Sequence, residues 1–175
     1  MKTTIAAAAL LAATLTTGAA RAEVVDAQPN GFEVRHVVAI AAPASAVWAV
    51  LVQPSKWWVS GHTWSGSAAN LSLGAASGGC FCERLPNGGS VLHMTTLYAA
   101  PGTRLVLSGA LGPMQSSGAT GALTFLLAEK DGRTTVTVTY DVGGYFKGGL
   151  DKIAAPVDGV LGQQVQGLKA AAEAR

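Results

Sequence analysis

The chain has 175 residues, of which 49% are hydrophobic and 13% charged, with 12 basic and 10 acidic side chains. This length suits one domain with a sizeable core, and the absence of a clustered basic face disfavours nucleic-acid binding. The sequence contains no P-loop, dinucleotide fingerprint, H-E-x-x-H motif or G-x-S-x-G elbow, which disfavours nucleotide chemistry, zinc-dependent proteolysis and nucleophile-elbow hydrolysis.

Residues 1–22 have the pattern of an export signal. Lys2 supplies a positive charge, residues 5–15 form an apolar run too short to cross a bilayer, and Ala20-Arg21-Ala22 resembles a cleavage site. We expect cleavage after Ala22, a single domain over residues 23–175, and a periplasmic or secreted location. Loss of the two basic residues of the signal leaves a domain without net charge. We expect no stable membrane insertion after cleavage.

The first part of the domain predicts one strand followed by two short helical segments. Alternation over residues 32–41 places five side chains on one face of a strand, namely Phe32, Val34, His36, Val38 and Ile40. Pro43 begins a short helix that ends at Pro54. The next segment contains Trp57, Trp58 and Trp64 and predicts a second short helical turn and a loop, either lining a pocket mouth or closing one end of the core.

The alternation of apolar and polar residues, together with turn signals, predicts six further strands. They lie at residues 68–73, 79–85, 90–99, 104–111, 119–128 and 134–142. The last strand is the most regular, and its Val136, Val138, Tyr140 and Val142 face inward.

Residues 149–173 predict a long helix with one apolar face, formed by Leu150, Ile153, Val157, Val160, Leu161, Val165 and Leu168. Pro156 predicts a kink there or a fresh start of the helix. Gln164 lies within the apolar stripe, so it is either a core side chain bonded to backbone or a polar group facing a ligand cavity. The order of elements predicts an α+β fold in which a curved antiparallel sheet of about seven strands wraps around this helix.

Two motifs and the order of elements resemble the SRPBCC or START-like superfamily, known as the helix-grip or birch-pollen-allergen fold. The motifs are the run Ala42-Pro43 to Val47-Trp48, Leu51 and Pro54, and Gly78-Gly79-x-Phe81-x-Glu83; Leu105 followed by a glycine-rich loop also matches. The resemblance covers the whole processed chain and is greatest to the branch of polyketide cyclase-like and heat-shock-ATPase activator-like proteins. Export argues against a heat-shock ATPase partner.

The resemblance implies a cavity between the sheet and the long helix for a small hydrophobic molecule, with no cofactor. The loop at residues 109–121 lies where such a cavity needs an opening, and its Met114 is a flexible apolar side chain. The candidate ligand-binding residues are Trp48, Trp58, Glu83, His93, Met114, Tyr140 and Gln164.

Cys80, Cys82 and His93 form the one group with evident chemistry. A tight turn at Asn87-Gly88 places Cys82 opposite His93 and Cys80 opposite Thr95, so that both thiols and the imidazole share one sheet face. Phe81, Glu83, Leu92 and Met94 then share the other face. A Cys80–Cys82 disulfide is disfavoured in a regular strand, where Cβ atoms two residues apart are about 6–7 Å apart, but a bulge would allow it.

Three interpretations of this group are open: two small buried cysteines beside a hydrogen-bonded histidine, a soft-metal site of Cys80, Cys82 and His93, or a thiolate–imidazole pair acting on a ligand. For the whole protein, the leading hypothesis is an exported binder of a small hydrophobic ligand. The alternatives are a cyclase- or hydratase-like enzyme using Glu83, His93 or Asp158 for acid–base work, and a metal or redox sensor.

Overall fold

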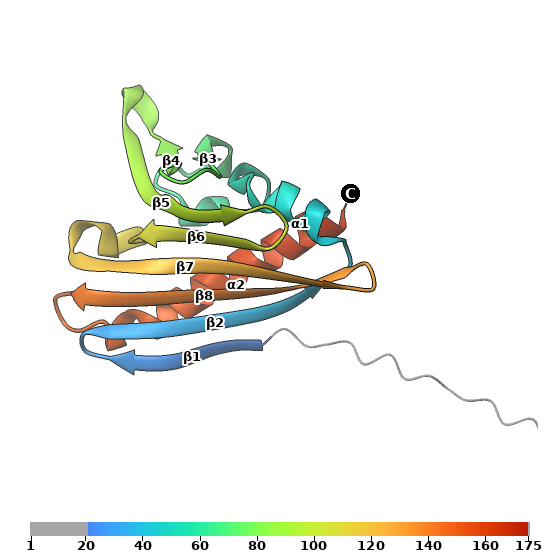
Figure 1. Cartoon of the computed structure of the whole chain (residues 1–175). Helices are drawn as coiled ribbons and strands as arrows, with labels where there is room; N and C mark the ends of the chain where they lie inside the picture. The colour runs from blue at the N-terminus through green and yellow to red at the C-terminus, as the bar shows by residue number, and fades with distance from the viewer. Residues whose placement is uncertain (1–20, 175) are drawn as a thin grey trace, which may run out of the picture.

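Eight antiparallel strands form one sheet that curves around a long helix in the computed structural model, which describes residues 21–174 (Figure 1). The strand order is β1-β2-β8-β7-β6-β5-β4-β3. This α+β architecture confirms the expected helix-grip fold. The expected signal falls almost entirely on residues 1–20, outside the described residues, so the signal and its cleavage stay predictions.

Seven strands correspond to the expected ones, and one was missed. The strands are β1 Arg21–Gln28, β2 Gly31–Ile40, β3 Leu71–Leu73, β4 Cys80–Arg84, β5 Ser90–Ala100, β6 Arg104–Gly109, β7 Gly118–Lys130 and β8 Arg133–Tyr145. Strand β1 was not predicted, because its pairing with β2 shifts register between Val24 and Asp26. The extra residue there interrupts the alternation from which a strand is recognised.

The core lies between the inner face of the sheet and the helices. The five side chains predicted to share one face of β2 are all buried, as are the four predicted to face inward from β8. Leu123, Phe125 and Leu127 of β7 continue this face, followed by Leu105 and Leu107 of β6. Alternation therefore predicted the inner face correctly wherever the strand pairing is regular.

Within residues 21–174, two α-helices accompany the sheet: α1 Ala44–Leu51 and α2 Asp151–Glu173. The second short helix expected after the first strand is instead a series of 3-10 turns at Pro54–Lys56, Ser60–His62 and Ala68–Asn70. Helix α2 continues through Pro156 without ending. The fresh start allowed by that proline does not occur. None of the helices in the described part of the chain is long and apolar enough to cross a membrane.

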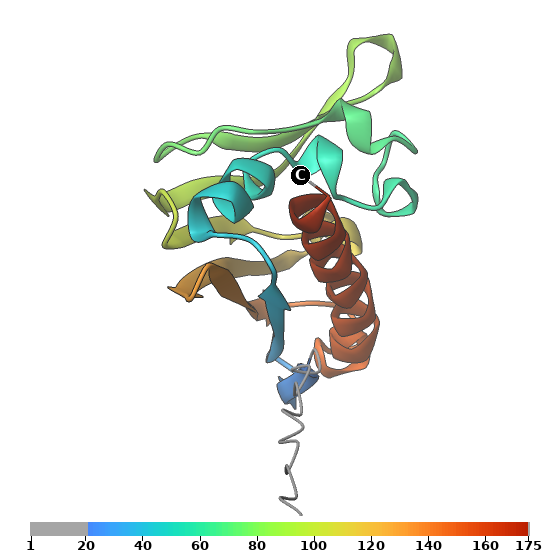
Figure 2. The same ribbon diagram turned by 90° about the vertical axis from the view of Figure 1, so that its right-hand side faces the viewer.

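Helix α2 lies across the concave side of the sheet (Figure 2). In its C-terminal half, Leu161, Val165 and Leu168 are buried, as the apolar stripe predicted. In its N-terminal half, Ile153 and Val157 are only half-buried. The sheet therefore leaves part of the apolar stripe uncovered, and this part borders the candidate site.

Candidate functional site

Two neighbouring hollows lie along the uncovered part of α2. The larger has a volume of 260 Å³ and is lined by Trp58, His62, Thr63, Trp64, Leu71, Phe81, His93, Leu111, Gly112, Pro113 and Val160. The smaller has a volume of 180 Å³ and is lined by Leu111, Gly112, Pro113, Met114, Phe146, Ile153, Pro156, Val157, Val160 and Leu161. Four lining residues are common to both, so we treat the hollows as one apolar crevice.

The inner wall of the crevice is a row of aromatic rings. The ring centroids of Trp58 and Phe81 are 5.4 Å apart in an edge-to-face arrangement, and those of Phe81 and His93 are 5.0 Å apart. The indole nitrogen of Trp58 donates to the carbonyl of His62 at 3.1 Å, which uses its polar atom within the protein. The wall therefore offers ring faces and edges to a ligand.

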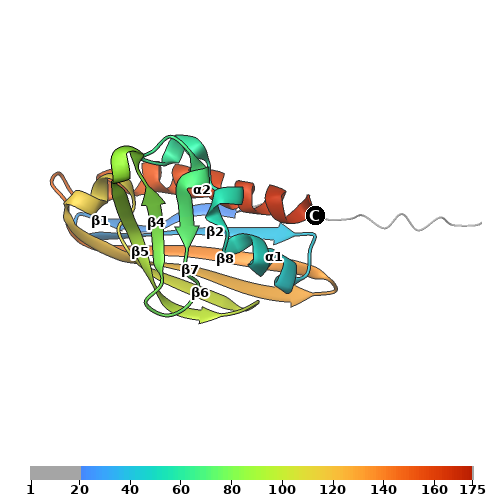
Figure 3. The same ribbon diagram turned by 90° about the horizontal axis from the view of Figure 1, so that it is seen from above.

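A connection from α1 to β3 forms the outer side of the crevice and is fastened to α2. Figure 3 shows this connection beside the helix. The backbone N–H of Val59 donates to Oε1 of Gln164 at 2.8 Å, and the His62 ring lies 3.1 Å from Oε1 of Gln163. Gln164 also donates to the carbonyl of Val160 at 3.3 Å. Gln164 is thus buried and bonded to backbone, and it does not line the crevice.

A buried hydrogen bond between His93 and Glu83 lies behind the aromatic wall. Nε2 of His93 is 2.9 Å from Oε2 of Glu83, and the Glu83 side chain is completely buried. Glu83 also accepts the backbone N–H groups of Trp64, at 3.1 Å, and of Ser65. This carboxylate therefore holds the connection from α1 to β3 at a second point.

The surroundings of Glu83 keep it ionised. Burial raises the pKa of its carboxyl, but the hydrogen bonds from Ser65, Trp64 and His93 together outweigh burial and hold the pKa below its ordinary value. A carboxylate that accepts several N–H bonds is stabilised in the charged form. Glu83 is therefore an acceptor at neutral pH, not a proton donor to a ligand.

The hydrogen bonds of Gln115 assign the tautomer of His93. The indole N–H of Trp64 donates to Oε1 of Gln115 at 2.8 Å, and an indole can only donate. The amide nitrogen of Gln115 must then face Nδ1 of His93, at 3.3 Å. Nδ1 is thus an acceptor, and Nε2 carries the proton donated to Glu83. Trp64, Glu83, His93 and Gln115 form a closed ring of hydrogen bonds, and both imidazole nitrogens are used within it.

The position of His93 corrects the predicted hairpin register. Cys80 does pair with Thr95, but Cys82 pairs with Leu92 instead of His93, because the register shifts between Phe81 and Cys82. The extra residue is His93, which turns to the inner face. Leu92, predicted to share a face with Phe81 and Glu83, is instead 60% exposed on the outer face.

Cys80 and Cys82 form a disulfide, with their Cα atoms 5.4 Å apart. Bridging in a regular strand was disfavoured, and the register shift beside Cys82 is the kind of irregularity that permits it. The sulfurs lie on the face opposite His93. In this oxidised state neither cysteine is a free thiol, so a thiolate–imidazole pair or a metal site of Cys80, Cys82 and His93 would first need the bond to be reduced.

The other predicted site residues are dispersed. Trp58 and His93 line the larger hollow and Met114 the smaller one. Trp48 lies half-buried on α1, away from the crevice. Tyr140 is fully buried, and its hydroxyl accepts the N–H of Leu111 at 3.2 Å and donates to the Gly109 carbonyl at 3.3 Å. It positions the loop that carries Leu111 and does not line the crevice.

Asp158 lies away from the Glu83 pair. Its Oδ1 is 2.9 Å from Nε2 of His36, a buried side chain on the inner face of β2. Neither residue lines the crevice. Of the three residues offered for acid–base work, only His93 lines the crevice.

Several crevice residues were missed by sequence reasoning as ligand-binding candidates. They are Phe81, Leu111, Pro113, Phe146 and Val160; Trp64, which also lines the larger hollow, belongs to the segment for which a pocket mouth was one of two predictions. Two signals existed: Phe81 shares a strand face with Glu83, and Val160 belongs to the apolar stripe of α2. Neither signal distinguishes a residue of the crevice wall from a residue of the core. The two differ only in whether other segments of the chain cover the side chain.

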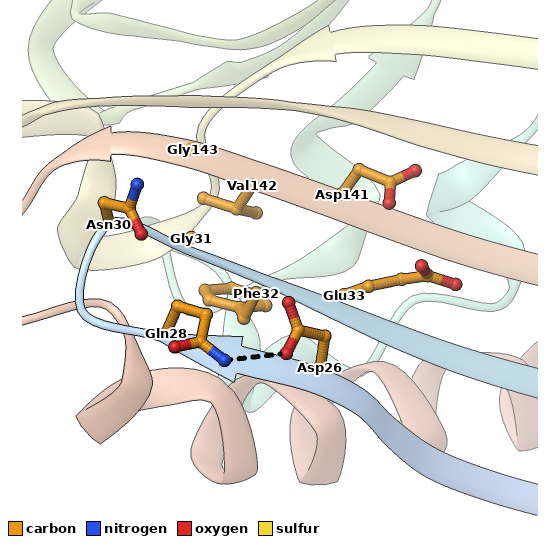
Figure 4. Close-up of a pocket in the computed structure, with 9 residues that line it drawn as sticks. All are labelled: Asp26, Gln28, Asn30, Gly31, Phe32, Glu33, Asp141, Val142 and Gly143. Atoms are coloured by element: carbon orange, nitrogen blue, oxygen red, sulfur yellow. Dashed lines mark hydrogen bonds between the residues drawn. The ribbon is translucent and has the colours of Figure 1, made fainter.

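A third hollow, of 380 Å³, lies at the end of β1, β2 and β8 (Figure 4). Asp26, Glu33 and Asp141 lie on adjacent strands there, with Asp26 paired to Glu33 and Glu33 to Asp141. Burial, together with the Glu33 charge, raises the pKa of Asp141, against the opposing effect of Arg35. Arg35 is bound to Glu33 at 2.6 Å. This polar surface hollow does not suit an apolar ligand.

Comparison with known protein families gives a match over most of the chain. Residues 31–173 match the family described as polyketide cyclase / dehydrase and lipid transport. The chain belongs to this family. Membership confirms the superfamily resemblance and indicates a ligand-binding or cyclase-like protein. No curated protein sequence matches the chain significantly.

Solved structures similar to this family member show the same fold at low sequence identity. An uncharacterised protein from Rhizobium leguminosarum is 17% identical, with 83% of this chain and 97% of that chain covered and a TM-score of 0.60. A protein from Chromobacterium violaceum is 17% identical, with 83% and 99% covered and a TM-score of 0.58. One from Arthrobacter aurescens is 14% identical, with 91% and 94% covered and a TM-score of 0.57.

Proposed function

We propose that this protein binds a small hydrophobic ligand in the crevice between α2 and the aromatic wall, without catalysis. The observation that carries the proposal is the partly uncovered apolar stripe of α2, where Ile153, Val157 and Val160 face the crevice half-buried. Apolar surface left in a concave site is stabilised when a ligand excludes water from it. The expected export signal supports a periplasmic or secreted location for this binding.

The ring of hydrogen bonds supports binding over catalysis. A general base needs a nitrogen that can reach the ligand, and both nitrogens of His93 are bonded to protein atoms. The Glu83 carboxylate accepts hydrogen bonds from Trp64, Ser65 and His93. These groups hold the wall of the crevice in place.

The test compares two matched substitutions on α2 against a panel of apolar aromatic compounds, with binding followed by calorimetry. Val160→Phe fills the region common to both hollows, whereas Gln166→Phe adds the same ring at an exposed position. We expect Val160→Phe to weaken binding about tenfold or more and Gln166→Phe to leave it unchanged. Equal affinity of both variants, or no binding by the natural sequence, would contradict the proposal.

The second candidate function is cyclase-like catalysis, favoured by a single observation: the His93 ring borders the crevice and is oriented by a buried carboxylate. Catalysis would require the 3.3 Å bond from Gln115 to Nδ1 to open. Turnover of a bound compound that is lost in His93→Gln while binding persists would support this candidate.

A further inference from the structure

Strand β4 is locally shortened where the disulfide joins Cys80 and Cys82. Their Cα atoms are 5.4 Å apart, whereas residues two apart in an extended strand are separated by about 6.6 Å. The shortening lies on the outer face of the sheet, directly behind Phe81, which forms part of the crevice wall.

The partner strand carries one residue too many at the same place. Phe81 pairs with Met94 and Cys82 with Leu92, so His93 has no partner across the ladder. A shortened strand beside a partner with an extra residue is a consistent pair of distortions. The regular ladder would continue from Phe81 and Met94 to Cys82 and His93.

The two pairings differ in which β5 side chain faces the crevice. Shifting a strand by one residue moves each side chain to the other face. The observed pairing puts His93 inside, bonded to Glu83 and Gln115, and leaves Leu92 60% exposed. The regular pairing would put Leu92 inside and His93 outside.

We propose that the Cys80–Cys82 disulfide is a redox switch that sets this register and so assembles the ligand crevice; the inference rests on the proposed function. In the oxidised protein the bulge holds His93 in the hydrogen-bonded ring. Reduction by a dithiol breaks the S–S bond, adds two electrons and two protons to form two thiols, and converts the dithiol into its own disulfide. Strand β4 then extends, and the hairpin takes the regular pairing.

Each state has its own stabilising contact, which makes the hairpin a two-state element. The oxidised register keeps the charge-assisted bond between His93 and Glu83. The reduced register loses it but buries the Leu92 side chain. The turn can absorb the one-residue shift, because Asn87 and Gly88 already adopt positive φ angles of 61° and 81°. Two backbone hydrogen bonds close this loop, from the Leu85 N–H to the Gly89 carbonyl at 2.8 Å and from the Gly89 N–H to the Pro86 carbonyl at 3.4 Å.

The shift reaches the crevice through the ring of hydrogen bonds. When His93 leaves, Gln115 loses one of its partners and Glu83 keeps only the backbone N–H groups of Trp64 and Ser65. The Trp64 indole, which is 56% exposed, is then held less firmly over the larger hollow. A ligand in that hollow would lose the His93 ring as part of its wall.

The first test follows the register directly by NMR of the full-length protein before and after addition of dithiothreitol. We expect cross-strand contacts between backbone protons of Cys82 and Leu92 in the oxidised protein, and between Cys82 and His93 in the reduced protein. Cys80→Ser/Cys82→Ser should show the reduced pattern with or without dithiothreitol. A reduced protein that keeps the Cys82–Leu92 contact would overturn the inference. Global unfolding on reduction would also overturn it, because the bond would then stabilise the whole fold.

The second test measures binding of anilinonaphthalene sulfonate to the same samples. We expect reduction to raise the dissociation constant about tenfold, as for the loss of one aromatic contact from the wall of the site. The double serine variant, insensitive to dithiothreitol, controls for effects of the reductant. A register change with equal affinity in both states would overturn the link to the crevice. A register change with no binding in either state would count against the proposed function and leave the disulfide control of register standing.

Discussion

Glu83 and His93 lie 2.9 Å apart across two neighbouring strands, and their contact exists only because a bulge in β5 turns His93 inward. The same carboxylate accepts the N–H groups of Trp64 and Ser65. One buried group therefore joins the sheet, the connection from α1 to β3 and the crevice wall. Its removal should affect both stability and binding.

Glu83→Gln should lower the free energy of unfolding by about 2–3 kcal/mol, since the amide cannot accept all three bonds and leaves a buried donor unpaired. Urea denaturation measures the change. Glu129→Gln is the matched control, because Glu129 is exposed and accepts only the Ala44 N–H at 2.8 Å; its effect should stay below about 1 kcal/mol. A Glu83 variant as stable as the control would show that the pair does not stabilise the fold.

Acid should weaken the fold through Glu83. Its folded-state pKa lies below the ordinary 4.5, so its contribution is fully present above that value and is lost as the pH falls through the lower folded-state pKa. The urea midpoint should therefore decrease between about pH 5 and pH 3. Glu83→Gln should show a shallower decrease, because it no longer has this group to protonate. Parallel pH profiles for both proteins would rule out the assigned role.

Tyr140→Phe should destabilise the protein by about 1–2 kcal/mol, since it leaves the Leu111 N–H without its acceptor. Burial also raises the pKa of the Tyr140 phenol well above its ordinary 10.0. The difference in ultraviolet absorbance between the natural protein and the variant should therefore show no phenolate signal at pH 10. A phenolate difference appearing at that pH would mean that the hydroxyl reaches solvent.

Two glycines of α2 should respond in opposite ways to alanine. A Cβ at Gly159 would meet no atom within 4 Å, so Gly159→Ala should stabilise by about 0.5–1 kcal/mol through helix propensity. A Cβ at Gly167 would overlap the carbonyl oxygen of Trp57, so Gly167→Ala should destabilise by about 1–3 kcal/mol. Thermal unfolding compares the pair, and a shift of the same sign for both would refute the described packing.

Sequence reasoning predicted the parts of the fold where a single period runs undisturbed. Residues 134–142 alternate without interruption, and the inner face of β8 was correct; the stripe of α2 likewise follows the helical repeat. It failed at two of the three bulges, near Val25 and at His93, because a bulge breaks the period that defines a strand and leaves no local signature.

For the crevice, only its location between the sheet and the long helix could be predicted, and most of its lining residues could not. Its walls combine Phe81 of β4, Val160 of α2 and Leu111 of a loop, residues far apart in the chain. Whether such residues line a hollow or fill a core depends on the space that distant segments leave open, which local patterns do not contain. Trp48 and Gln164 were predicted to bind the ligand but do not line the crevice. The polar or aromatic character of a side chain does not by itself place that side chain at a ligand.

Helix α2 follows every strand in the chain, and it supplies one wall of the crevice and the cover of the sheet. During synthesis all eight strands emerge before the helix that shields their inner face. The apolar row on β2, β8 and β7 must then stay exposed, or be shielded by another protein, until residues 151–173 arrive. Chains that stop short of α2 should therefore aggregate, and the ligand crevice should be the last feature of the fold to form.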